Sequence, residues 1–357
     1  MASSASTLLV TGGAGFIGSN FIHYLFKQAD FTGTVINVDK LTYAGNPENL
    51  SDIEKEHGGT RYFFEKADIC DHEKISAVVE KYSIDTVVNF AAESHVDRSI
   101  FGPKEFIQTN IVGTFTLLEA AKKVWGARQD VLFHHVSTDE VYGSLGETDF
   151  FHENTPYAPR SPYSASKAAS DHLVSAYFYT YHLPVTISNC SNNYGPFHFP
   201  EKLIPLMILN MLEEKPLPVY GDGKNVRDWL FVEDHCSAIY AILKKGRHGE
   251  TYNIGGENEW TNIELVNLLC EKVAEKNNKP REYYKKLITF VNDRPGHDRR
   301  YAINCDKIKN ELGWKQAVTF AEGLDRTVTW YLANPEWIEH IKSGEYRTWL
   351  EKNYETR

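Results

Sequence analysis

Two adjacent carboxylates, Asp139 and Glu140, lie in the segment STDEVYG at residues 137–143, directly after the apolar run FHHVS. Two acidic side chains at the end of a buried strand repel each other, and burial penalises the charge of each. Their pKa values can therefore split, so that one carboxyl group donates a proton while the other accepts one. The alternative is an acid cluster that the dipole of a following helix favours. The first arrangement suits a reaction with two proton transfers.

A tyrosine and a lysine in the segment YSASK form a second chemical candidate. Tyr163 and Lys167 are four residues apart, so on a helix they share one face. A phenol, with a reference pKa of about 10, is a poor base at neutral pH. A nearby ammonium group and a positively charged nicotinamide ring would stabilise the phenolate. Ser137 or Thr138 can hydrogen-bond the same substrate oxygen. Alone, the pair would be read as a solvated helix face.

A glycine-rich turn near the N-terminus favours the chemical interpretation. The segment TGGAGFIG follows an apolar run and opens a helical pattern, and its regularly spaced glycines are Gly12, Gly15 and Gly18. Such a turn lets the backbone and a helix N-terminus approach a pyrophosphate. The next apolar run ends at Asp39, whose carboxylate suits the hydroxyls of an adenosine ribose and repels a 2′-phosphate. The pattern predicts NAD as the cofactor rather than NADP.

The elements that must position these groups alternate along the first half of the chain. Strand-like runs cover residues 7–12, 34–39, 85–92, 130–137 and 183–189, and helical patterns cover 16–29, 72–82, 104–124 and 163–182. This alternation predicts an α/β fold with a Rossmann-type, doubly wound parallel sheet. After residue 195, prolines and the GDG at 221–223 indicate loops and short elements, with helices at 263–276 and 321–333. We expect a NAD-binding domain over 1–195 with a return segment near 228–255, and a smaller C-terminal α/β substrate-binding lobe over 196–357.

The composition excludes several classes of protein. The 357 residues carry a net charge of −10, which disfavours nucleic acid because phosphates need clustered cations. No apolar run reaches the roughly 18 residues of a membrane helix, and the N-terminus lacks the basic start of a signal peptide. The five cysteines have no metal-site spacing and are expected as reduced thiols. We therefore expect a cytoplasmic protein without metal, nucleic-acid partner or membrane.

Together the motifs resemble the nucleotide-sugar 4,6-dehydratases of the extended short-chain dehydrogenase/reductase superfamily, most closely the dTDP-glucose 4,6-dehydratases. The segments that carry the resemblance are TGGAGFIG, STDEVYG, YSASK, NNYGPFHFPEKLIPL, PLPVYGDGKNVRDW and DRPGHDRRYAI. Epimerases of this superfamily usually have small or hydroxyl residues where Asp139 and Glu140 lie, so the acid pair favours a dehydratase. The resemblance implies dTDP-glucose as substrate. UDP-glucose or UDP-N-acetylglucosamine, a 4-epimerase and a non-catalytic dinucleotide-binding regulator are the alternatives.

The resemblance also implies a mechanism that uses both carboxylates. Tyr163, supported by Lys167 and Thr138, would take the C4 hydroxyl proton while C4 gives hydride to NAD. The resulting ketone acidifies the C5 proton, which Glu140 would remove while Asp139 protonates the departing C6 hydroxyl. The hydride would then return to C6, which regenerates NAD.

The binding residues are carried over by position. Together with the glycines of the turn, the family's NAD contacts fall on Phe16, Ile17, Asp39, Lys40, Leu41, Thr42, Asp68, Ile69, Ala91, Ala92, Ser94, Thr109, Ser137, Tyr163, Lys167 and Asn193. Its sugar contacts fall on Ser94, Thr138 and Asn192, and its nucleotide-diphosphate contacts on Lys202, Leu203, Pro218, Val219, Tyr220, Arg227, Asn262, Asp293, Arg294, Pro295, Gly296 and His297. A further expectation is a homodimer formed by helices 104–124 and 163–182. We expect His134 and His135 in the core and His95 near the site.

Overall fold

The computed structural model describes residues 6–342, and its centre is a seven-stranded parallel sheet in the order β10-β6-β5-β4-β1-β2-β3. The strands are β1 (Thr7–Thr11), β2 (Thr34–Asp39), β3 (Tyr62–Lys66), β4 (Thr86–Asn89), β5 (Leu132–Thr138), β6 (Val185–Cys190) and β10 (Thr251–Ile254). Every residue of β4, β5 and β6 is buried, as continuous apolar runs predict for a sheet covered on both faces. The predicted doubly wound fold is confirmed.

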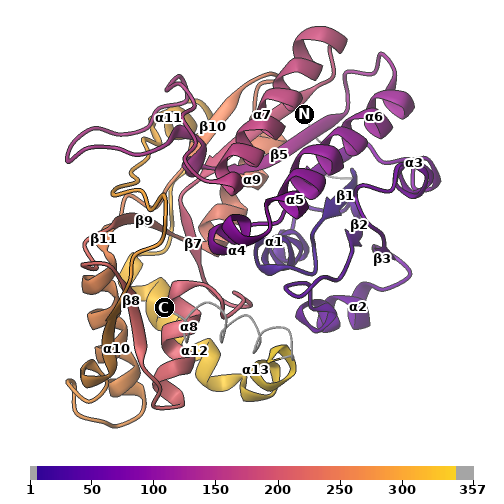
Figure 1. Ribbon diagram of the computed structural model, residues 1–357. Helices are drawn as coiled ribbons and strands as arrows, with labels where there is room; N and C mark the ends of the chain where they lie inside the picture. The colour runs from indigo at the N-terminus through magenta and orange to yellow at the C-terminus, as the bar shows by residue number, and fades with distance from the viewer. Residues whose placement is uncertain (1–5, 343–357) are drawn as a thin grey trace.

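Helices cover both faces of this sheet (Figure 1). They are α1 (Phe16–Lys27), α2 (Ser51–His57), α3 (His72–Lys81), α6 (Thr114–Trp125), α7 (Pro162–Tyr181), α9 (Val232–Lys245) and α11 (Asp306–Leu312). On one face α1 packs against α9, and on the other α6 packs against both α3 and α7. β1 lies between β4 and β2. From β1 the sheet grows first toward β2 and β3, and then on the other side toward β4, β5 and β6. In such sheets the ligand site lies at the carboxyl ends of the strands near this point.

A smaller lobe, seen at the lower left of Figure 1, lies next to those strand ends. It contains α8 (Leu203–Leu212), α10 (Asn262–Lys276), α12 (Phe320–Ala333) and α13 (Pro335–Ile341), the strand pair β8 (Leu217–Tyr220) and β12 (Ile288–Val291), and a sheet of β7 (Asn192–Tyr194), β9 (Val226–Phe231) and β11 (Glu259–Thr261). It has its own hydrophobic core. Between β9 and β11 the chain returns to the large sheet, where β10 pairs with β6. The predicted domain boundaries remain a prediction, and their outer ends, 1–5 and 343–357, lie outside the described residues.

Two elements differ from the sequence prediction. The predicted helix over 104–124 is not one regular helix. A π-helical segment, Ile107–Gly113, separates the short helix α5 (Pro103–Phe106) from α6. Another short helix, α4 (Val96–Phe101), precedes α5. At its end Gly113 packs so closely that a Cβ there would lie 2.4 Å from Cδ1 of Ile69. In the C-terminal part, residues that we expected in loops form α8, whose apolar side chains are mostly buried in the core of the lobe.

Candidate active site

A cavity of about 420 Å³ lies between the carboxyl ends of the large sheet and the C-terminal lobe. The loops after β1, β2, β4, β5 and β6 supply one side of it, and α8, β8, β9 and the start of α10 supply the other. This is the position expected for the ligand site of an open α/β sheet. Because side chains of both lobes line it, a ligand that fills the cavity contacts both.

The glycine turn forms one end of the cavity. Gly12 donates its backbone N–H to Val38 at 2.8 Å, and a Cβ on Gly18 would lie 2.3 Å from the backbone oxygen of Gly12. Asp39 fixes the turn, since its carboxylate accepts from the backbone N–H of Ala14 at 3.0 Å and of Leu41 at 2.8 Å. The turn therefore leaves room for close approach of a phosphate, with a carboxylate beside it. This arrangement fits NAD.

The acid pair begins a 3-10 turn, Asp139–Tyr142, at the end of β5. Thr138 caps the turn, because its hydroxyl oxygen accepts from the backbone N–H of Glu140 at 3.3 Å. Asp139 is buried, and its Oδ2 makes no hydrogen bond within residues 6–342. Burial, followed by the charge of Glu140, raises the pKa of Asp139 well above its usual range.

Glu140 has different surroundings from its neighbour. Burial raises its pKa above the usual range, but the positive charges of Arg294 and Lys202 oppose that rise. The side chain is partly exposed, and it lines the cavity beside Arg227. The surroundings therefore differ: burial and the charge of Glu140 both favour the protonated form of Asp139, whereas nearby cations favour the ionised form of Glu140.

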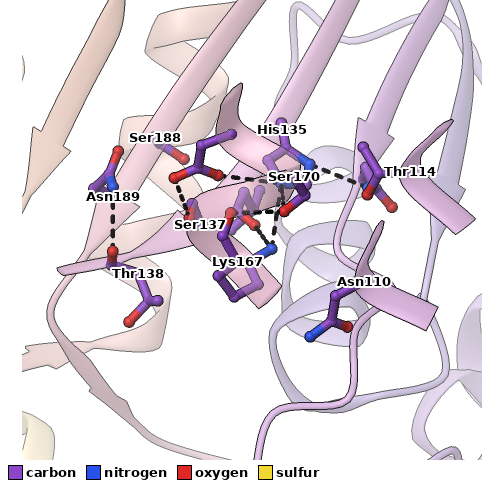
Figure 2. Close-up of polar contacts among 12 residues, drawn as sticks. Asn110, Thr114, His135, Ser137, Thr138, Lys167, Ser170, Ser188 and Asn189 are labelled. Carbon is purple, nitrogen blue, oxygen red and sulfur yellow. Dashed lines mark hydrogen bonds and ion pairs between the residues drawn. The ribbon is translucent and has the colours of Figure 1, made fainter. Parts of the chain in front are cut away.

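Tyr163 and Lys167 face the same cavity from the first two turns of α7. Ser161 starts the helix with a capping box, in which its hydroxyl oxygen accepts from the backbone N–H of Ser164 at 3.0 Å. Burial, followed by the charge of Glu140, raises the pKa of Tyr163 well above its usual value. Lys167 donates from Nζ to the backbone oxygen of Val136 at 2.8 Å (Figure 2). Tyr163, Lys167 and the acid pair thus line one cavity.

Comparisons with known proteins agree with this geometry. A family model described as GDP-mannose 4,6 dehydratase matches residues 9–327. A dTDP-glucose 4,6-dehydratase of Salmonella typhimurium is 55% identical over 364 residues, covering 98% of this chain and 99% of the relative. The chain belongs to the dTDP-glucose 4,6-dehydratase family.

Two solved structures of dTDP-glucose 4,6-dehydratases have the same fold. The one from Bacillus anthracis, in complex with NAD, is 50% identical with a TM-score of 0.83, covering 95% of this chain and 100% of the other. The one from Streptomyces venezuelae, with NAD and TYD bound, is 45% identical with a TM-score of 0.85, covering 94% and 100%. The resemblance inferred from the motifs is confirmed, and with it the enzyme class, since dTDP-glucose 4,6-dehydratases are NAD-dependent hydro-lyases.

Most residues carried over from the dTDP-glucose 4,6-dehydratases line the cavity. They are Gly12, Gly15, Phe16, Ile17, Gly18, Asp39, Lys40, Thr42, Asp68, Ile69, Ala91, Ala92, Ser94, Thr109, Ser137, Thr138, Asp139, Glu140, Tyr163, Lys167, Asn192, Asn193, Lys202, Leu203, Pro218, Tyr220, Arg227, Asn262, Arg294 and His297. His95 lies there too, and the strand residues His134 and His135 are buried in the core as expected. Their roles toward a ligand remain predictions.

Five of the carried-over residues lie outside the cavity lining: Leu41, Val219, Asp293, Pro295 and Gly296. Along β8, Pro218 and Tyr220 face the cavity, so the alternation of a strand turns Val219 into the core of the lobe. Asp293 is exposed and accepts from Nδ1 of His297 at 2.6 Å, so it orients a lining residue. The contact predicted between Val219 and the nucleotide remains a prediction.

The sequence analysis missed several lining residues, among them Glu93, Asp97, His198, Phe199, Glu201, Leu206, Met207 and Trp229. The segment GPFHFPEK contains three of them, so it was a usable signal. His198 stacks on Phe16 with ring centroids 4.1 Å apart. Buried polar atoms without a hydrogen-bond partner in residues 6–342 include Asn192 Oδ1, His198 Nδ1, Trp229 Nε1 and Arg294 Nε. All four residues line the cavity, which therefore suits a polar ligand.

Neither a metal site nor a membrane-spanning helix is found in the part of the chain that the structure describes. No group of three or more His, Cys, Asp or Glu side chains there is arranged to hold a metal ion. No helix among the same residues has the length and apolar character needed to cross a membrane.

Replacing Asp139 with asparagine is expected to stabilise the folded protein at pH 8. The folded-state pKa of Asp139 is raised above the unfolded value of about 3.9. The contribution of this carboxyl group to stability is therefore complete below pH 4 and is lost as the pH rises toward the folded-state pKa. Asparagine has the shape of the protonated acid and avoids this loss. Thermal unfolding of wild type and variant from pH 4 to pH 8 measures it.

The expected pattern is a melting temperature that is higher for the Asp139→Asn variant at pH 8, with the difference shrinking toward pH 4. A variant that melts at or below the wild-type temperature at pH 8 would show that Asp139 carries no penalty for its charge. Asp222→Asn is the matched control, because Arg299 and the backbone N–H of Lys224 hold the pKa of Asp222 at about 2. That substitution should not stabilise the protein.

Proposed function

We propose that this protein converts dTDP-glucose to its 4-keto-6-deoxy product by removing one water across C5 and C6. The observation that carries the proposal is the split acid pair in the same cavity as Tyr163 and Lys167. Oxidation at C4 alone needs one base, whereas loss of water needs a second base and an acid. The 55% identity to a dTDP-glucose 4,6-dehydratase over nearly the whole chain supports this reaction.

NAD, when bound, accepts a hydride from C4 and later returns it to C6. The glycine turn and Asp39 would hold its pyrophosphate and ribose, and the ion pair of Lys40 with Asp68, 2.7 Å apart, would border its adenosine end. Tyr163 would remove the proton of the C4 hydroxyl. Lys167 stabilises the phenolate by its charge, and Thr138 positions the same oxygen of the sugar.

The acid pair performs the second stage. The ketone at C4 acidifies the C5 proton, and Glu140 takes it, because the cations around Glu140 favour its ionised form. Asp139, held protonated, gives its proton to the C6 hydroxyl so that it leaves as water. Glu140 later returns a proton to C5. The cycle closes when Tyr163 loses the proton that it took from the C4 hydroxyl and Asp139 regains the one that left with water.

The C-terminal lobe would hold the nucleoside diphosphate. Lys202, Arg227 and Arg294 bring three cations to the cavity, which suits a diphosphate. Tyr220 offers an aromatic face, and its hydroxyl donates to Asp97 at 2.9 Å. UDP-glucose and UDP-N-acetylglucosamine remain the alternative substrates, because one methyl group in a pocket changes specificity by only ~1–3 kcal/mol.

Mass spectrometry with three substrates tests the proposal. The purified protein is mixed separately with dTDP-glucose, UDP-glucose and UDP-N-acetylglucosamine, without added NAD. We expect dTDP-glucose to lose one water and the others to react more slowly or not at all. Loss of water from a UDP-sugar alone would change the substrate, and an isomer of unchanged mass would indicate a 4-epimerase.

We also propose that two copies pair through the surface of α4, α5, α6 and the π-helical segment Ile107–Gly113. Large apolar side chains are exposed there: Phe101 is 52%, Ile107 53% and Phe115 45% accessible. Contiguous exposed apolar surface on a soluble protein marks an interaction site. Tyr179 and Tyr181 extend exposed aromatic surface along α7, which packs beside α6.

Replacing Phe115 with aspartate is expected to produce monomers, because it places a charge in the centre of the proposed interface. Sedimentation velocity measures the species, and the dissociation constant should rise at least about 100-fold. Phe290→Asp is the control, since Phe290 is 58% exposed on β12 of the other lobe. A wild-type protein that sediments as a monomer, or a Phe115→Asp variant that still dimerises, would contradict this interface.

For location we propose the cytoplasm. All five cysteines are free thiols in the structure, which is the usual state in a reducing compartment. A small-molecule nucleotide sugar is the partner that the cavity supports.

A further inference from the structure

A buried carboxylate, Asp171, follows the base of the reaction along α7. Tyr163, Lys167 and Asp171 are spaced four residues apart in one helix, so they lie along one face. Tyr163 and Lys167 line the cavity, but Asp171 does not, and only 1% of its surface is accessible. A carboxylate at this depth is costly unless nearby groups compensate for its charge.

Two hydroxyl groups hold one oxygen of Asp171. Ser137 donates to Oδ2 at 2.8 Å, and Tyr157 donates to the same atom at 3.1 Å. The other oxygen, Oδ1, makes no hydrogen bond within residues 6–342 and lies 3.4 Å from Nε2 of His135. Asp171 therefore has one oxygen fixed by two hydroxyl groups and the other directed toward His135.

His135 lies between Asp171 and Lys167. Its Nε2 is 3.3 Å from Nζ of Lys167 (Figure 2). On its other side, Nδ1 is 3.1 Å from Nδ2 of Asn89, whose Oδ1 accepts from Thr11 at 2.6 Å. This fixes Asn89 as the donor, so we assign the ring proton to Nε2. Burial lowers the pKa of His135 to about 4, so the ring is neutral and does not cancel the charge of Asp171.

Lys167 is the cation of this buried group. Burial lowers its pKa, and the charge of Asp171 opposes that change, with Cys190 of β6 acting in the same direction. The other titratable groups around Asp171 and Lys167 are His135 of β5, Tyr142 of the turn after β5, Tyr157 of the following loop and Tyr163 of α7. Tyr163 in turn feels the charges of Asp139 and Glu140. Without Asp171, burial alone would favour neutral Lys167.

We propose that Asp171 is a positioning residue that keeps Lys167 charged, so that Lys167 can hold Tyr163 as a phenolate. The role rests on the proposed function only in naming Tyr163 as the base. Asp171 touches neither substrate nor cofactor and acts through Lys167. Because Asp171 does not line the cavity, a ligand bound there does not contact it directly.

Asp171→Asn tests the role with little change of shape. The amide oxygen can still accept from Ser137 and Tyr157. The amide nitrogen takes the place of Oδ1, 3.4 Å from Nε2 of His135. The ionisation of Tyr163 is followed by ultraviolet difference absorbance at increasing pH, by subtracting the same protein with Tyr163→Phe. We expect the pKa of Tyr163 to rise by at least about one unit in the Asp171→Asn protein, because its neighbouring cation is lost.

The pH dependence of kcat/KM gives a second readout. The acid limb of this profile should move to higher pH by the same amount. At a pH below the limb, kcat/KM should therefore fall at least about tenfold. Asp234→Asn is the matched control, since this buried aspartate of α9 only accepts from the backbone N–H groups of Ala317 and Val318, at 2.8 and 3.1 Å. It should lower stability without moving either curve.

An unchanged Tyr163 titration in Asp171→Asn, with activity unchanged or reduced equally at every pH, would overturn the proposal. The titration needs no substrate, so it decides the matter even if dTDP-glucose proves to be the wrong sugar nucleotide. If Asp171→Asn does not fold, Lys167→Met and the double variant are compared by thermal unfolding. Because both charges are then removed, the double variant should fold and melt at or above the temperature of Lys167→Met. A double variant that melts below Lys167→Met would also contradict the role.

Discussion

Replacing Glu140 with glutamine is expected to lower kcat at least about 100-fold while leaving oxidation at C4 intact. Glutamine keeps the size of the side chain, but an amide cannot take the C5 proton. The cations near position 140, Arg294 and Lys202, remain to bind the substrate. The reaction should therefore stop after its first stage. Rapid mixing with dTDP-glucose should show the absorbance of reduced nicotinamide rise and persist, with almost no 4-keto-6-deoxy product.

The control for this variant is Glu147→Gln, an exposed glutamate outside the cavity lining, which should turn over as wild type does. Asp139→Asn should also accumulate reduced nicotinamide, because it lacks the proton for the C6 hydroxyl. If Glu140→Gln dehydrated the substrate at the wild-type rate, the acid pair would have no part in water loss. The assignment as a dehydratase would then rest on sequence similarity alone.

Replacing Tyr163 with phenylalanine is expected to lower kcat by roughly 1,000-fold or more, near the upper range for loss of a general base. Here no reduced nicotinamide should appear, because the C4 hydroxyl keeps its proton. The phenyl ring retains the packing against Phe106, whose ring centroid lies 6.3 Å from that of Tyr163. Substrate affinity, measured by calorimetry, should therefore change by only a few-fold.

Tyr283→Phe is the control, since Tyr283 lies in the C-terminal lobe outside the cavity lining, and its hydroxyl donates to the exposed Glu214 at 2.6 Å. It should leave kcat unchanged. Reduced nicotinamide that forms at the wild-type rate in Tyr163→Phe would show that another group removes the C4 proton. The contrast between Tyr163→Phe and Glu140→Gln also fixes the order of the two stages.

The sequence predicted the elements whose cause is local. Continuous apolar runs predicted β1, β2, β4, β5 and β6 to within a few residues, and the glycine turn predicted the start of α1 at Phe16. The π-helical segment Ile107–Gly113 was not predicted. At its end Gly113 packs closely against Ile69 from another part of the chain, and a local sequence pattern does not reveal such a contact. α8 was missed because the prolines around it indicated loops.

In the candidate site too, residues in short motifs could be predicted, whereas residues placed by tertiary packing could not. Asp139 with Glu140, and Tyr163 with Lys167, lie in short motifs, and the structure brings both pairs to one cavity. Side chains alternate along β8, so Val219 faces the core of the lobe while Pro218 and Tyr220 face the cavity. His198 and Trp229 reach the cavity through the way the two lobes pack. Asp171 carries no motif signal either, since its relation to Lys167 depends on His135 from β5.

The most direct test of the proposed reaction follows the hydrogen on C4, with dTDP-glucose deuterated at C4 and no added NAD. We expect a product that has lost one water and carries the deuterium at C6, as mass spectrometry and proton NMR would show. Deuterium that stays at C4 in an isomer of unchanged mass would contradict the account and indicate a 4-epimerase. Loss of water without deuterium at C6 would contradict the return of the C4 hydride to C6.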